Sequence, residues 1–151
     1  MPFTTRGVVV DLLDAEGTLV APLAYQGKVD YWVVPSGFRT DFASVPQVAM
    51  WLFPSLGKYT RAAVLHDWFC KHLAIGDSVV SARDADAIFR RVMREAHVGF
   101  CSRWLMWTGV RWGALTNRTR RAGWLRDAPA VFGITALVLL PFVLVLAAVL
   151  S

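Results

Sequence analysis

The residues best suited to chemistry in this sequence are a histidine and the aspartate that follows it, His66 and Asp67. An imidazole has a pKa near 6.5, so at neutral pH it can take a proton from water, and a carboxylate on its other nitrogen fixes its tautomer. The chain offers a second acid twenty positions later, at Asp86. We therefore predict that His66 and Asp86 form a catalytic pair in which His66 is the base.

The segment around His66 has the pattern of a helix from about 60 to 74, with Gly76 just after its end. At 100° per residue, five apolar residues lie within about 60° of the histidine, so its ring is expected in the middle of the apolar face. These residues are Ala62, Ala63, Phe69, Cys70 and Leu73. Asp67 falls at the edge of the same face. A buried imidazole needs a hydrogen-bond partner, which makes a second acid necessary.

A second helix is expected to begin at Ser81, which suits an N-cap, with Asp84 in its first turn. Its apolar stripe comprises Ala85, Ile88, Phe89, Val92, Met93 and Ala96. Asp86 lies at the border of that stripe. Two antiparallel helices joined by a short loop bring their apolar faces together, so we expect His66 and Asp86 to meet across the seam.

The chain before these helices has the pattern of short strands. Gly7–Leu13 and Thr18–Tyr25 predict a β-hairpin and Val29–Val34 a third strand. A proline- and glycine-containing loop follows at 35–46, and then a short helix at 46–53. The expected fold is α+β, with an N-terminal antiparallel β-meander packed beside a helical half that carries the His-Asp motif.

A third helix is expected at Val98–Leu115, with tryptophans among arginines. Such a mixture suits the interfacial layer of a bilayer, although the tryptophans would equally well fill the core of the domain. These residues are Trp104, Trp107, Trp112, Arg103 and Arg111.

The C-terminal part is apolar without interruption, and no charged residue occurs between Ala130 and Leu150. This run is long enough to cross a hydrocarbon layer of about 30 Å as a helix, and Pro141 predicts a kink in it. Three parts follow: an α+β domain at 1–115, a basic juxtamembrane linker at 116–128 and a transmembrane tail anchor at 129–151. Arginines before the run, read by the positive-inside rule, place the N-terminal domain in the cytoplasm, at a host inner membrane.

Charge also indicates the partners. The net charge is +5. Much of the positive charge lies just before the apolar run, beside Trp124, and favours an anionic lipid surface over nucleic acid. The residues concerned are Arg118, Arg120, Arg121 and Arg126. The two cysteines, Cys70 and Cys101, are too few for a disulfide scaffold, which is typical of a reducing compartment.

Three motifs in order resemble a small phage and prophage family known as domain of unknown function 1353. They are GFRTDFASVP at 37–46, AAVLHDW at 62–68 and RDADAIF at 83–89, and the resemblance covers roughly 7–113. It implies a phage or prophage origin, with other phage proteins as further partners, but no activity.

The spacing of Ala-Ala-x-x-His-Asp and Ala-Asp-x-x-Phe is also similar, more distantly, to the phospholipase A2 segment of parvovirus capsid proteins. That resemblance implies a calcium-dependent hydrolase of membrane phospholipid, with His66 activating water, Asp67 holding Ca²⁺ and Asp86 orienting the histidine. A glycine-rich calcium loop is expected before the active helix, where this chain has only 53–59, with Gly57 as the ligand-bearing glycine. The tyrosine that usually follows four positions after the histidine is Cys70 here.

Other interpretations stay open at this point. A His-Asp pair on a helix is often structural, and Asp86 would also pair with Arg90 one turn on. The chain would then be a non-enzymatic phage protein in the membrane, serving in structure, assembly, lysis or superinfection exclusion. Asp41 is a further candidate carboxylate near the site. A metal-dependent phosphohydrolase of the His-Asp type ranks last, because its sites need several histidines and none precedes His66.

Overall fold

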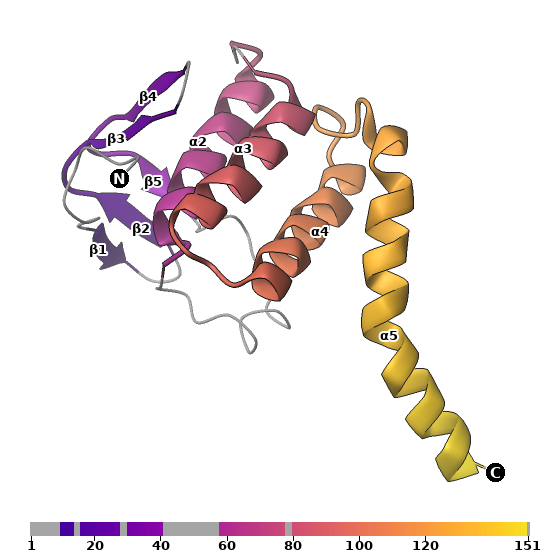
Figure 1. Cartoon of the computed structure of the whole chain (residues 1–151). Helices are drawn as coiled ribbons and strands as arrows, with labels where there is room; N and C mark the ends of the chain where they lie inside the picture. Colours follow the sequence, from indigo (N-terminus) through magenta and orange to yellow (C-terminus); the bar gives the residue numbers. More distant parts are fainter. Residues whose placement is uncertain (1–9, 14–15, 28–29, 41–57, 78–79, 151) are drawn as a thin grey trace.

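The computed structural model describes residues 10–13, 16–27, 30–40, 58–77 and 80–150. Short strands form one side of the molecule, three helices pack beside them, and a long helix leaves the far side (Figure 1). The predicted α+β arrangement is confirmed, as is the C-terminal apolar helix. The predicted short helix at 46–53 lies outside the described residues.

The strands form two small antiparallel sheets. In the first, β1 (Val10–Leu13) pairs with β2 (Glu16–Leu19), and β2 pairs with β5 (Arg39–Thr40). In the second, β3 (Leu23–Gln26) pairs with β4 (Tyr31–Val34). The continuous strand expected at 18–25 is therefore wrong: the chain bends at 20–22 and enters another sheet, in a stretch where Pro22 has no N–H for a ladder.

The first two helices match their predicted positions closely. Helix α2 spans Thr60–Ile75 and ends at Gly76, whose φ of 83° is the left-handed conformation that glycine adopts easily. Helix α3 spans Ala82–Glu95, and its N-cap Ser81 accepts a hydrogen bond from the Asp84 N–H. The two pack against each other and share a core with β3 and β4. Buried residues of this core include Leu23, Tyr25, Val34, Leu65, Phe69, Phe89 and Met93.

Helix α4 (Phe100–Thr116) packs on α3 and carries the tryptophans. Trp107 is buried, and Trp104 and Trp112 pack beside it in a second, smaller cluster with Trp124 and Val131. Trp124 belongs to the short 3-10 helix η1 (Trp124–Arg126). The tryptophans of α4 thus fill space inside the protein. Of the two predicted alternatives, a bilayer interface and the core of the domain, the structure agrees with the second.

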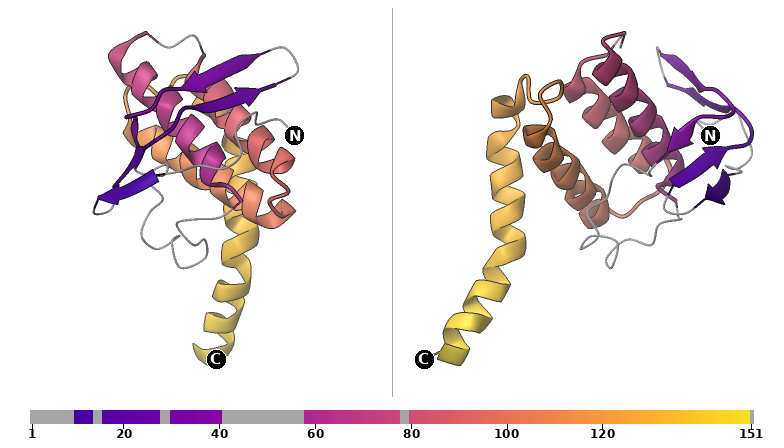
Figure 2. Two further views of the ribbon diagram at one scale, coloured as in Figure 1. Left: turned by 90° about the vertical axis from the view of Figure 1, so that its left-hand side faces the viewer. Right: turned by 180° about the vertical axis from the view of Figure 1, so that it is seen from behind.

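Helix α5 (Ala128–Leu150) is a candidate membrane span by its length of 23 residues and mean hydropathy of 2.8. Its first half lies along α4, where Trp112 Nε1 donates a hydrogen bond of 3.0 Å to Thr135 Oγ1. Residues 139–150 are exposed and extend beyond the rest of the protein (Figures 1 and 2). The helix bends near its middle, in the part of the sequence that holds Pro141.

Candidate functional site

Helix α2 places His66 in the interior, as its helical position predicts. The residue is 2% exposed, and its ring centroid lies 4.9 Å from that of Phe89 on α3. Asp86 comes from the facing side of α3 and is fully buried. Because the two helices pack face to face, the imidazole and the carboxylate are brought together from positions twenty residues apart.

The contact between them is short. His66 Nε2 lies 2.6 Å from Asp86 Oδ1, slightly shorter than the usual length of about 2.7–2.9 Å for a charge-assisted N–H···O hydrogen bond. The predicted pairing of His66 and Asp86 is therefore present. The pairing of Asp86 with Arg90 is not: Arg90 lies instead over the Trp104 ring, 4.0 Å from its centroid.

Two arginines complete the surroundings of Asp86. Arg111 Nη1 of α4 donates to Oδ2 at 2.8 Å, and Arg120 Nη2, from the segment after α4, donates to Oδ1 at 2.9 Å. Arg111 is completely buried. Arg120 was predicted to face an anionic lipid surface, and Arg111 to lie either at a bilayer interface or beside tryptophans of the core. Both instead donate to the buried Asp86. The sequence signal that identifies Arg111 is its spacing: it shares a helical face with Trp107 and Ala114.

The network continues to the start of α5. Arg111 Nη2 lies 3.3 Å from Asp127 Oδ2, and Arg83 Nε donates to Asp127 Oδ1 at 3.0 Å. Asp127 immediately precedes α5, and its carbonyl accepts a hydrogen bond from the Val131 N–H. Charged side chains therefore connect the His66 site on α2 with the first turn of the candidate membrane span.

This environment shifts both pKa values of the pair. Burial of the ring lowers the pKa of His66, but the contacts with Cys70 and with the Asp86 carboxylate outweigh it and raise that pKa to about 10. Burial raises the pKa of Asp86, but His66, Arg120 and Arg111 hold it below its usual value. At neutral pH the pair is thus an imidazolium and a carboxylate.

The second ring nitrogen of His66, Nδ1, is the atom that would accept a proton if this residue acts as a base. Its Nδ1 lies 3.8 Å from Cys70 Sγ, and the sulfur is 3.7 Å from Nε2. The sulfur lies within hydrogen-bonding distance of both nitrogens, so its contact is shared between them and is not directed at Nδ1 alone. Cys70 stands where the distant phospholipase resemblance has a tyrosine, and it lies against the ring rather than on Asp86.

Asp67, the predicted calcium ligand, is in contact with the first sheet. It is 5% exposed, and its Oδ2 accepts a hydrogen bond from the Thr40 hydroxyl of β5. Gly57 and Asp41 lie outside the described residues. Within the described part of the chain no three histidine, cysteine or acidic side chains gather as a metal site would need. Among the predicted calcium ligands, Asp67 is the one carboxylate that lies in the described part of the chain.

Comparison with known proteins places the chain in a family. Residues 17–110 match the family described as "Protein of unknown function (DUF1353)". The chain belongs to the DUF1353 family. The matched range contains His66, Asp67 and Asp86, whereas Arg111, Arg120 and α5 follow it.

A curated relative is "Uncharacterized protein y4jT" of Sinorhizobium fredii (strain NBRC 101917 / NGR234). It is 32% identical over 106 residues, which are 68% of this chain and 30% of the relative. The chain therefore spans about a third of the length of the relative that it matches. No solved structure matches the chain.

Proposed function

We propose that this DUF1353 protein is a membrane-attached hydrolase of phospholipid esters in which His66 is the general base. The observation that supports this most is the 2.6 Å contact of His66 Nε2 with Asp86 Oδ1. A carboxylate on Nε2 fixes the ring and leaves Nδ1 to accept a proton from water, the arrangement that such a base needs. Helix α5 would hold the site beside its substrate.

In the proposed reaction the Nδ1 atom of neutral His66 takes a proton from water while the water oxygen attacks the ester carbonyl. The tetrahedral intermediate then breaks its bond to the glycerol oxygen, which receives the proton from His66. A fatty acid and a lysophospholipid leave. Calcium held by Asp67, with the Gly57 carbonyl as a further ligand, would stabilise the negative charge on the carbonyl oxygen.

The protonation state of His66 sets a condition on this proposal. With a pKa of about 10, the ring carries a proton at neutral pH and cannot accept another. Since only the neutral ring acts as a base, the proposed activity requires alkaline pH, and its rate increases as the pH rises toward the pKa of His66.

The test is fatty acid release by the full chain from phosphatidylglycerol vesicles at pH 9, with calcium or with EDTA. We expect release with calcium, at least a hundredfold less with His66→Gln, since general-base catalysis contributes about 10²–10⁴-fold, and a strong decrease with EDTA or Asp67→Asn. Ser36→Ala, at an exposed turn between β4 and β5, should release as the natural chain does. No release by protein with its native circular dichroism spectrum would contradict the proposal.

A second candidate function is favoured by the two arginines. Asp86 is already paired with Arg111 and Arg120, and His66 is almost inaccessible, which suits a structural ion-pair cluster in a non-enzymatic membrane protein. In that case His66→Gln would lower the melting temperature while the natural chain released no fatty acid. Fatty acid release that depends on His66 would exclude this candidate.

The setting of the proposed function is a phage or prophage protein at the inner membrane of its host, with the N-terminal domain in the cytoplasm. The arginines before α5 support this orientation, and Arg118 and Arg121 are exposed there. Trypsin should therefore cleave after these residues in inverted membrane vesicles and not in intact spheroplasts. Cleavage in spheroplasts would reverse the orientation.

A further inference from the structure

Outside the His66 site, a cavity of about 330 Å³ lies between α3 and α4 and is lined by four arginines. They are Arg90, Arg91, Arg94 and Arg103, together with Ala87, Phe100 and Trp104. Arg91 pairs with Asp30 at 2.6 Å. Among the residues that the structure describes, no carboxylate pairs with the other three. In the described part of the chain Arg90 has only the more distant charge of Asp127 acting on it, and the concentration of positive charge around the cavity fits an anionic ligand.

The immediate surroundings keep these charges close together. The Arg90 guanidinium stacks on Trp104, and Arg103 lies 5.7 Å from the Phe100 ring centroid. Burial lowers the pKa of Arg90, and the charges of Arg103 and Arg94 lower it further. The cavity also adjoins the first turn of α4, which has no acidic residue and no capping side chain, so free backbone N–H groups add to the positive field.

A second cavity of about 500 Å³ adjoins the first and differs in character. It is a groove between α4 and α5, lined almost wholly by apolar atoms. Phe100 and Trp104 line both cavities, and the remaining wall comes from Cys101, Leu105, Ala130, Gly133, Ile134, Leu137 and Val138. One ligand with a charged end and an apolar end would therefore occupy both.

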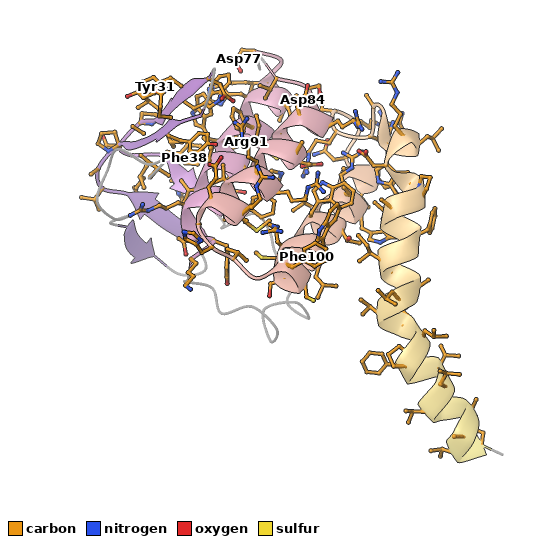
Figure 3. The ribbon with its side chains drawn as sticks, in the orientation of Figure 1. Tyr31, Phe38, Asp77, Asp84, Arg91 and Phe100 are labelled. Carbon is orange, nitrogen blue, oxygen red and sulfur yellow. The ribbon has the colours of Figure 1, made fainter. Side chains whose placement is uncertain are left out.

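The position of the groove indicates which ligand this is. Phe100 lies at the end of the domain from which 139–150 extend, and Arg91 lies farther up α3 (Figure 3). Residues 139–150 would reach roughly 18 Å, about one leaflet, into a bilayer. If all of α5 were inserted instead, the α5 wall of the groove would lie within the bilayer.

We propose that this composite site binds a single anionic phospholipid, with the headgroup phosphate among Arg90, Arg94 and Arg103 and one acyl chain in the groove. Guanidinium groups are well matched to phosphate oxygens, and an apolar groove at the membrane suits a hydrocarbon chain. Arg90 follows Asp86 by one turn of α3, but no residue that lines the two cavities takes part in the His66–Asp86 contact. Lipid binding at this site does not depend on whether His66 catalyses a reaction.

The test measures lipid affinity of the full chain in neutral detergent with EDTA, so that calcium-dependent hydrolysis does not consume the ligand. Phosphatidylglycerol, phosphatidylcholine and glycerol 3-phosphate are titrated separately, and bound lipid is counted by native mass spectrometry. We expect one phosphatidylglycerol per chain, and binding of the other two at least about tenfold weaker.

Two variants address the two halves of the site. Arg94→Gln with Arg103→Gln removes headgroup charge, and Gly133→Leu fills the groove, where an added Cβ meets no atom within 4 Å. Each should weaken phosphatidylglycerol binding about tenfold. Matched controls are Lys58→Gln with Lys71→Gln, which remove the same charge at exposed positions elsewhere, and Gly113→Leu, at an equally open α4 position outside the groove. Both should bind as the natural chain does, with unchanged melting temperatures.

Four results would overturn the proposal. Equal affinity for phosphatidylcholine would exclude charge recognition. Equal affinity for glycerol 3-phosphate would show that the site takes free phosphate esters. An unchanged affinity in Gly133→Leu would show that the acyl chain is not bound in the groove. An equal loss in the control variants would show that general charge or folding, and not this site, determines binding.

Discussion

At the scale of residues, one carboxylate organises the centre of the protein. Asp86 accepts hydrogen bonds from three cationic side chains, His66, Arg111 and Arg120, and all three reach it in the interior. Removing a charge from water is costly, and Asp86 is the carboxylate that all three cations share, with Asp127 as a second partner of Arg111. The fold therefore depends on Asp86 more than on any exposed ion pair.

Asp86→Asn should lower the free energy of unfolding by about 3–5 kcal/mol, because it leaves Arg111 buried without its carboxylate. Denaturant titration in detergent micelles measures the loss. The matched control is Arg83→Gln, which breaks an exposed pair with Asp127 and should cost less than about 1 kcal/mol. Equal losses of unfolding free energy in the two variants would show that the buried cluster contributes no more to stability than the exposed pair.

The sequence predicted the His66–Asp86 contact because helical periodicity is local and both residues lie on apolar faces. It could not predict Arg111 and Arg120 as partners. Their positions depend on how α4 and the segment after it fold back over α3, which is a long-range arrangement. The tryptophans beside Arg111 fit a membrane interface and a core equally well by composition alone.

At the scale of elements, the ends of helices α2 and α3 were the most predictable features, because local sequence signals mark them. Gly76 ends α2 and Ser81 caps α3, both as expected, since each uses a residue type suited to that backbone position. Strand ends were harder. The bend at 20–22 sends the chain from one sheet to another, and only tertiary pairing determines where such a break falls.

Ser81→Ala should destabilise the protein by about 1 kcal/mol, because the Asp84 N–H loses the oxygen that caps α3. Thermal unfolding followed by circular dichroism measures the change. Ser36→Ala, at an exposed turn between β4 and β5, serves as its control and should leave the melting temperature unaltered. A melting temperature that is the same in both variants would mean that the cap contributes nothing to α3.

At the scale of the whole molecule, the buried network connects the His66 site with α5. Arg111 contacts Asp86 on one side and Asp127 on the other, and Asp127 stands at the first turn of α5. The tryptophan cluster packs α4 against the same turns. The domain is thereby fixed to the candidate span rather than tethered by a loose linker, so the proposed site would keep a constant position relative to lipid.

The most direct test of the central claim is the rate of fatty acid release as a function of pH. Because the raised pKa of His66 keeps the ring protonated below about 10, the fraction of neutral base grows tenfold with each pH unit up to that value. The full chain with calcium should therefore hydrolyse phosphatidylglycerol about a hundredfold faster at pH 9 than at pH 7, and His66→Gln should show no such increase. A rate that does not change between pH 7 and 9, or one that His66→Gln retains, would contradict the role given to His66.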